Sequence, residues 1–188
     1  MVYFLFHPRS AINLLKSNKR FYSPLEIRYW STTPYKLGDN QVVKYSLIPQ
    51  QLKQTPIPPK PSFDYMREHL VEQLSAQEYA FDFCVQLRTL PDSMPIEDPG
   101  KLWKEEISPF VKVATLRIPQ QSFDSPEQNI YGRDLSFNPW HSLPDHQPLG
   151  GINRARKVIY ETLSKFRHEK NHAAITEPTD FSVPPTGN

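Results

Sequence analysis

Hydrophobic and polar residues alternate along three segments of the chain, as they do in a strand that buries one face. The segments are residues 41–48, 79–90 and 111–118. The second is the clearest, and its alternating apolar residues are Phe81, Phe83, Val85 and Leu87. A turn sequence, Gly-Asp-Asn at 38–40, precedes the first segment. We therefore expect a hairpin formed by the residues on either side of that turn.

A period near 3.6 residues predicts helices in three other places. They are residues 8–20, residues 63–77 and a long segment that begins near Gly151 or Asn153. The helix at 63–77 begins after a cap at Ser62 or Asp64. Its predicted apolar side contains Phe63, Met66, Leu70 and Leu74.

Proline marks the boundaries of the folded region. Five prolines fall between residues 49 and 62, and they predict an extended linker with polyproline II character. Such a segment also suits recognition by a proline-binding module, although a connecting arm is the commoner use. The polar, proline-rich residues 173–188 predict a disordered tail. We therefore divide the chain into a helical segment at 1–22, a domain at 23–172 and this tail.

Composition limits the class of protein. The chain has 188 residues, 38% of them hydrophobic, which suits one domain with a core. A net charge of +2 is too small to indicate nucleic-acid binding, and no apolar run is long enough to span a membrane. The single cysteine, Cys84, excludes an intrachain disulfide and fits a reducing compartment. Together with the absence of a secretory signal pattern, this predicts a cytoplasmic protein.

The long C-terminal helix carries the most informative side chains. Arg156 and Tyr160 are four residues apart, and Arg167 follows seven residues after the tyrosine. At 100° per residue, the three lie within about 40° of one line along the helix. One interpretation is a surface tyrosine among solvated arginines. The other is a face that approaches a large anionic, aromatic or metal-bearing ligand, because a neighbouring cation favours the phenolate form and tyrosinate is a known ligand of haem iron.

Two histidines lie in the proline-containing loop before this helix. His141 and His146 are candidate metal ligands, but hydrogen bonding to the backbone or to a carboxylate is the commoner role of such residues. Ser142, His141 and Asp145 include the residue types of a catalytic triad. Close neighbours in one loop seldom reach triad geometry, so we do not predict a hydrolase.

The segment 138–168 resembles the proximal haem-binding region of the haem-dependent catalase-like superfamily. Its upstream part, LSFNPWHSLPDHQPLGGINRAR, is most similar to the short, divergent catalase-related branch. The resemblance implies that Tyr160 is the axial ligand of the haem iron, with Arg156 beside it and Arg167 at a haem propionate. It also implies that Phe137 and Ile152 are apolar contacts of the haem.

The resemblance extends from about residue 23 to residue 168 and corresponds to the second half of a catalase-like domain. It implies an α+β fold: part of the catalase-like antiparallel β-barrel with a C-terminal haem-ligand helix. Two positions depart from the family pattern: Thr162 stands where aspartate is usual and Ser164 where a haem-side histidine is usual. The distal histidine and asparagine motifs of the family are not found.

These features predict a haem-binding, catalase-related oxidoreductase that processes peroxide. A relative that processes fatty-acid hydroperoxides is one alternative. A non-catalytic or vestigial haem-binding fragment is the other, because the distal side is missing. An incomplete barrel exposes strand edges, so we also expect self-association or a partner chain that supplies the missing half.

Overall fold

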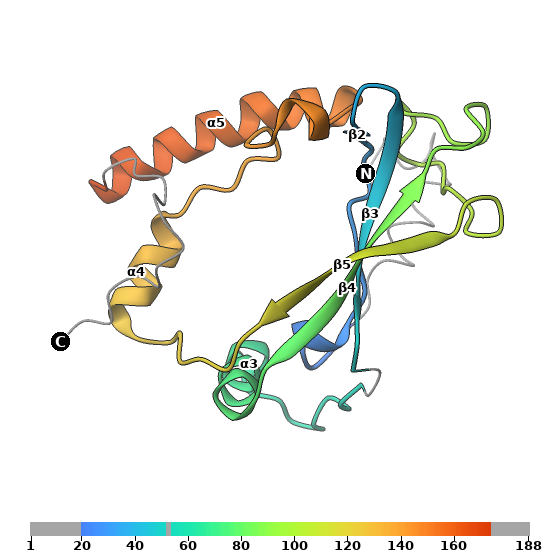
Figure 1. Cartoon of the computed structure of the whole chain (residues 1–188). Helices are drawn as coiled ribbons and strands as arrows, with labels where there is room; N and C mark the ends of the chain where they lie inside the picture. The colour runs from blue at the N-terminus through green and yellow to red at the C-terminus, as the bar shows by residue number, and fades with distance from the viewer. Residues whose placement is uncertain (1–19, 52–53, 174–188) are drawn as a thin grey trace, which may run out of the picture.

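An antiparallel sheet and one long helix dominate the structure, a computed structural model that describes residues 20–51 and 54–173 (Figure 1). The helix predicted at 8–20 and the predicted tail lie outside these residues, apart from Arg20 and Ala173. Among the described residues, no helix is both long and apolar enough to cross a membrane.

The sheet has five strands in the order β1-β3-β4-β5, and β2 also pairs with β3. Their bounds are β1 (Tyr29–Trp30), β2 (Tyr35–Leu37), β3 (Gln41–Pro49), β4 (Tyr79–Leu87) and β5 (Phe110–Ile118). The three predicted strands are confirmed as β3, β4 and β5, and the predicted hairpin is β2–β3, with Gly38 at φ 64° in its turn. The sheet is open and does not close into a barrel. The predicted partial barrel is therefore confirmed only in part: the strands form an antiparallel sheet, but this sheet is not curved into a closed barrel.

Three α-helices accompany the sheet. They are α3 (Tyr65–Ala76), α4 (Pro126–Asp134) and α5 (Gly151–Asn171), and two 3-10 turns, η1 (Pro24–Glu26) and η2 (Pro144–His146), lie between other elements. The helix at 63–77 is confirmed as α3, but Phe63 precedes it and is fully exposed, so its predicted place on the apolar side is wrong. The sequence reasoning did not predict α4, which begins with a capping box between Ser125 and Gln128.

The hydrophobic core lies where α3 packs on the sheet. Leu25, Leu74, Tyr79 and Phe81 are buried together there. The carboxylate of the buried Glu26 accepts hydrogen bonds from the amide of Gln73 at 2.8 Å and from the hydroxyl of Thr55 at 2.8 Å. Thr55 belongs to the proline-rich segment, so this part of the chain is attached to the core as a connecting arm. Pro49, the first residue of the predicted linker, is instead the last residue of β3.

A second buried cluster lies at the other end of the sheet. The Trp103 side chain is buried, and its indole nitrogen donates to the Pro95 carbonyl at 3.3 Å. The amide of the buried Gln86 donates to the Trp103 carbonyl at 3.1 Å. The Lys44 ammonium lies 4.6 Å from the centre of the Trp103 ring, and burial lowers the pKa of this lysine while Asp98 partly offsets the effect.

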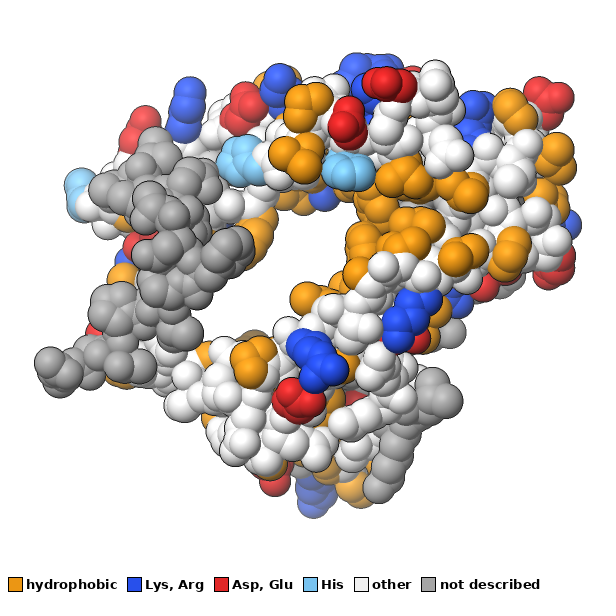
Figure 2. Space-filling model, in the orientation of Figure 1, with side chains coloured by type: hydrophobic (Ala, Val, Ile, Leu, Met, Phe, Trp, Pro, Cys, Tyr) orange, Lys and Arg blue, Asp and Glu red, His pale blue; other side chains and the backbone are white. Residues whose placement is uncertain are grey.

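The long helix meets the sheet only near its N-terminal end. The Lys36 amide in β2 donates to the Gln147 carbonyl, and the Leu149 amide donates to the Pro34 carbonyl, each at 2.9 Å. From there α5 extends along one side of an open space, with the sheet and α3 on other sides (Figures 1 and 2). Large apolar side chains of α5 are consequently exposed, namely Ile152, Val158, Ile159, Leu163 and Phe166.

Gly150 sets the direction of α5, and its replacement tests this role. Its φ of 87° is left-handed, and an added Cβ would lie 2.8 Å from the Ile96 carbonyl oxygen. Gly150→Ala is expected to lower the free energy of unfolding by about 1–3 kcal/mol, measured by urea denaturation. Gly132→Ala is the control, because its Cβ meets nothing within 4 Å inside α4, and it should stabilise by about 0.5–1 kcal/mol. Equal stability of the two variants would contradict this interpretation.

Candidate functional site

Asn153 anchors the helix that carries the candidate site. Its side chain is 0% exposed, and its amide nitrogen donates to the carbonyls of Pro34 at 3.2 Å and Leu149 at 2.8 Å. Its amide oxygen lies 3.2 Å from the Thr33 hydroxyl and 3.2 Å from Nη1 of Arg156, both of which donate to it. One buried side chain therefore joins the sheet-side segment, the loop before α5 and the arginine one turn further along.

The loop before α5 is held against the same residue. The Trp140 indole nitrogen donates to the Asn153 backbone carbonyl at 2.8 Å. The Lys157 ammonium lies 5.0 Å from the centre of the Trp140 ring. These contacts fix residues 138–141 beside the second turn of the helix, so this loop and α5 together position the site.

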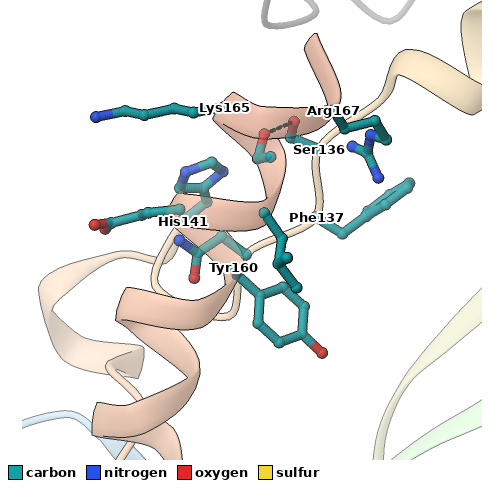
Figure 3. Close-up of a pocket in the computed structure, with 10 residues that line it drawn as sticks. Ser136, Phe137, His141, Tyr160, Lys165 and Arg167 are labelled. Carbon is teal, nitrogen blue, oxygen red and sulfur yellow. Dashed lines mark hydrogen bonds between the residues drawn. The ribbon is translucent and has the colours of Figure 1, made fainter. Parts of the chain in front are cut away.

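Arg156 and Tyr160 form a contacting pair, as their four-residue spacing predicts. Nη2 of Arg156 is 3.4 Å from the Tyr160 hydroxyl, and its guanidinium carbon is 5.2 Å from the ring centre. Tyr160 is 38% exposed. Figure 3 shows its hydroxyl directed away from α5. The oxygen is thus accessible to a ligand while a cation that is held by Asn153 lies next to it.

Arg167 lies on α5, two turns after Tyr160. Phe137, from the segment that precedes the helix, lies beside Arg167 (Figure 3). Nη2 of Arg167 donates to the Leu135 carbonyl at 2.5 Å, whereas its Nε is buried without a hydrogen-bond partner. Phe137 is 75% exposed. The Phe137 ring and the Arg167 side chain therefore lie beside each other at this end of the site.

These side chains line a pocket of about 460 Å³ between α5 and the segment that precedes it. Its lining residues are Ser136, Phe137, Asn138, His141, Tyr160, Glu161, Leu163, Ser164, Lys165 and Arg167. The structure thus places three predicted site residues, Phe137, Tyr160 and Arg167, in one pocket, with Arg156 in contact with Tyr160. Ile152 is exposed on the first turn of α5 and does not line this pocket.

The loop histidines do not form a metal centre. His141 lines the pocket, and the buried Nδ1 of His146 has no hydrogen-bond partner. Within residues 20–51 and 54–173, no three His, Cys, Asp or Glu side chains lie close enough together to hold a metal ion. Cys84 is buried, and burial raises the pKa of its thiol, so the thiol is not activated as a nucleophile.

Sequence reasoning missed a polar chain at the far end of the pocket. The Ser136 and Ser164 hydroxyl oxygens are 2.5 Å apart, and Ser164 Oγ is 3.4 Å from Nδ1 of His168 (Figure 3 shows the serine contact). His168 is 4% exposed, and its Nε2 is 2.7 Å from the Asp134 carbonyl oxygen. The four-residue spacing of Ser164 and His168 was a usable signal, whereas the contact with Ser136 depends on tertiary structure.

Comparison with known proteins identifies the fold. No protein-family model and no curated protein sequence matches this chain. Among solved structures, a bacterial catalase is similar with a TM-score of 0.72 at 16% identity, covering 99% of this chain and 40% of the catalase. A fungal catalase is similar with a TM-score of 0.65 at 16% identity, covering 81% of this chain and 33% of its own. Catalase A from Saccharomyces cerevisiae has a TM-score of 0.60 at 16% identity, covering 77% of this chain and 32% of its own.

The predicted catalase-like resemblance is therefore confirmed at the level of the fold. The chain spans between 32% and 40% of the length of these catalases. Its mixed helices and antiparallel sheet match part of a catalase, in agreement with the expected α+β class.

Removal of the Asn153 side chain tests whether it anchors the site. Asn153→Ala is expected to lower the free energy of unfolding by about 2–3 kcal/mol, because the carbonyls of Pro34 and Leu149 each lose a hydrogen bond from this buried side chain. Urea denaturation followed by circular dichroism measures the change. Thr162→Ala, at an exposed position of the same helix, is the control and should change stability by less than about 0.5 kcal/mol. Similar losses in both variants would argue against the anchoring role.

Proposed function

We propose that this chain binds haem through Tyr160 and acts as a catalase-related, peroxide-processing oxidoreductase. The carrying observation is the Arg156–Tyr160 pair, in which an accessible phenol oxygen lies 3.4 Å from a guanidinium nitrogen. Tyrosinate is a ligand of ferric haem iron, and the guanidinium of Arg156 supplies a positive charge next to the oxygen that would ligate it. Arg156 is itself held by Asn153, so the pair needs little reorganisation to accept the ligand.

The chemistry of the pocket fits the other parts of a haem. Haem is a broad apolar ring system with carboxylates at one edge, and Phe137 and Leu163 supply exposed apolar contacts for the ring. The guanidinium of Arg167, whose side chain lines the pocket, supplies a positive charge for a propionate. Ile152 is proposed as a further apolar contact at the other end of the helix, where it is exposed.

When bound, haem iron supplies the redox chemistry toward peroxide. In such a complex Tyr160 would hold the iron, Arg156 would offset the charge on the Tyr160 oxygen, and Arg167 would orient the ring by contacting a haem propionate. Peroxide heterolysis also needs an acid–base group on the opposite side of the ring. The sequence lacks the family's distal histidine motif, and His141 comes from the same segment that carries Phe137, next to α5.

Because no acid–base group is identified among the described residues for the side of the ring opposite Tyr160, a haem-binding protein without peroxide turnover is the second candidate. It is favoured by the open sheet. The edge strand β5 supports completion by another polypeptide, either a second copy or a separate chain. Its residues from Val111 to Arg117 are all exposed, including the apolar Val111, Val113 and Leu116.

Haemin titration of the purified chain tests the axial assignment. Tyr160→Phe is expected to weaken haemin binding about 10-fold or more and to abolish the ferric tyrosinate absorption signature, because the ligating oxygen is removed. Tyr131→Phe is the matched control, since Tyr131 is 39% exposed on α4 and Tyr160 is 38% exposed. The axial assignment fails if the parent binds no haemin, or if Tyr160→Phe retains the parent's spectrum.

Peroxide consumption by the haemin-loaded chain separates the two candidate functions. The enzymatic proposal predicts turnover that exceeds free haemin at equal concentration and falls to the free-haemin rate in Tyr160→Phe. Oxygen release and peroxide loss measured together provide the readout. Turnover no faster than free haemin, with the tyrosinate signature present, supports the non-catalytic binder instead.

A further inference from the structure

The Ser136–Ser164–His168 chain has a defined direction. Nε2 of His168 lies 2.7 Å from a backbone carbonyl oxygen, which only accepts, so this nitrogen carries the proton. In a neutral imidazole, Nδ1 must then accept, and Ser164 donates to it across 3.4 Å. The Ser164 proton is thereby used, so Ser136 is the donor in the 2.5 Å contact between the two hydroxyl groups. With neutral His168, Ser136 therefore presents only lone pairs to the pocket.

Protonation of His168 reverses this direction. In the imidazolium form both ring nitrogens donate, so Nδ1 donates to Ser164 while Nε2 keeps its bond to the Asp134 carbonyl. Ser164 can then donate to Ser136, and the Ser136 proton is released toward the pocket.

Charged groups lie near the His168 ring. Asp134, at the end of α4, interacts electrostatically with His168 and is paired with Arg133, and Arg167 and Glu169 are the neighbours of His168 on α5. The Arg133 guanidinium, with the Asn171 amide, holds the pKa of the Asp134 carboxyl below its usual range, and the charge of His168 acts in the same direction. An ionised Asp134 is therefore present to offset an imidazolium.

Ser136, the last member of this hydrogen-bond chain, lies next to Arg167 in the pocket. Arg167 donates to the carbonyl of Leu135, the residue before Ser136. Both Arg167 and Ser136 line the pocket, next to the apolar Phe137 (Figure 3). A guanidinium nitrogen and a hydroxyl at one corner of an apolar pocket suit a carboxylate on an apolar skeleton.

We propose that Arg167 and Ser136 form a carboxylate site whose affinity rises when His168 is protonated, through the Ser136–Ser164–His168 chain. Ser164 and His168 are positioning residues, because they act through Ser136. The carboxylate comes either from a haem propionate, in which case the inference rests on the proposed function, or from a free apolar acid.

Binding of haemin and of haemin dimethyl ester at about pH 8 and about pH 5.5 tests this site. The ratio of the two affinities isolates the carboxylates, since the iron and the ring are common to both ligands. In the parent chain, the preference for the free acid is expected to rise about 3- to 10-fold at the lower pH, which corresponds to one added charge-assisted hydrogen bond. Dodecanoate binding at both pH values is the arm for a free apolar acid.

Two variants show whether the Ser136–Ser164–His168 hydrogen bonds cause the pH dependence of carboxylate binding. His168→Gln keeps a donor and an acceptor but cannot gain a proton, and Ser164→Ala breaks the chain while leaving the bond from His168 to Asp134. Each should flatten the pH dependence, whereas Thr162→Ala should retain it. Circular dichroism establishes that each variant is folded, and Ser164→Ala keeps the test decisive if His168→Gln does not fold.

The outcomes separate this inference from the proposed function. A tyrosinate signature together with a pH-independent ratio overturns the carboxylate switch and leaves haem binding intact. If neither haemin ligand binds, the proposed function fails, and the dodecanoate arm alone decides. If dodecanoate binds more strongly at the lower pH and Ser164→Ala removes this pH dependence, the site is one for free apolar acids. If dodecanoate does not bind, or if its pH dependence is unchanged in Ser164→Ala, the proposed site is overturned.

Discussion

The buried carboxamide of Asn153 is the interaction on which the candidate site depends. It is fully buried and makes hydrogen bonds with both its nitrogen and its oxygen, so it joins residues 33–34, Leu149 and Arg156. A buried amide is costly unless its polar atoms are paired, and this pairing permits few orientations of α5. Because α5 meets the sheet only near this end, the direction of Tyr160 is set by a residue two turns away.

A helix that meets the sheet only near its N-terminal end leaves much of its surface uncovered. The remaining length of α5 lies beside an open space and exposes several large apolar side chains (Figure 2). Among the described residues, β5 is an edge strand of the sheet, and its residues 111–117 are exposed. Apolar surface of this extent is usually covered by a ligand or by another polypeptide.

The pocket combines accessible aromatic surface with positive charge at both ends. Arg156 lies at the phenol of Tyr160, while Arg167 and the buried His168 lie at the other end, beside Ser136 and Ser164. This distribution suits a ligand that is apolar in the middle and carries negative charge or acceptor atoms at its edges. It does not require a cluster of protein metal ligands, and the described residues contain none.

The sequence by itself determined the elements whose signals are local. Alternation with a period of two specified β3, β4 and β5, and the 3.6-residue period specified α5 and brought Arg156 to Tyr160. It did not reveal that Phe63 lies outside α3, that the sheet stays open, or that Asn153 is the anchor. The position of Phe63 is a matter of where α3 begins, but the sheet, the anchor and the contact between Ser136 and Ser164 join residues far apart in sequence; Asn153 and Thr33 are 120 positions apart. Only tertiary structure decides them, because burial and hydrogen-bond partners depend on which distant segments pack together.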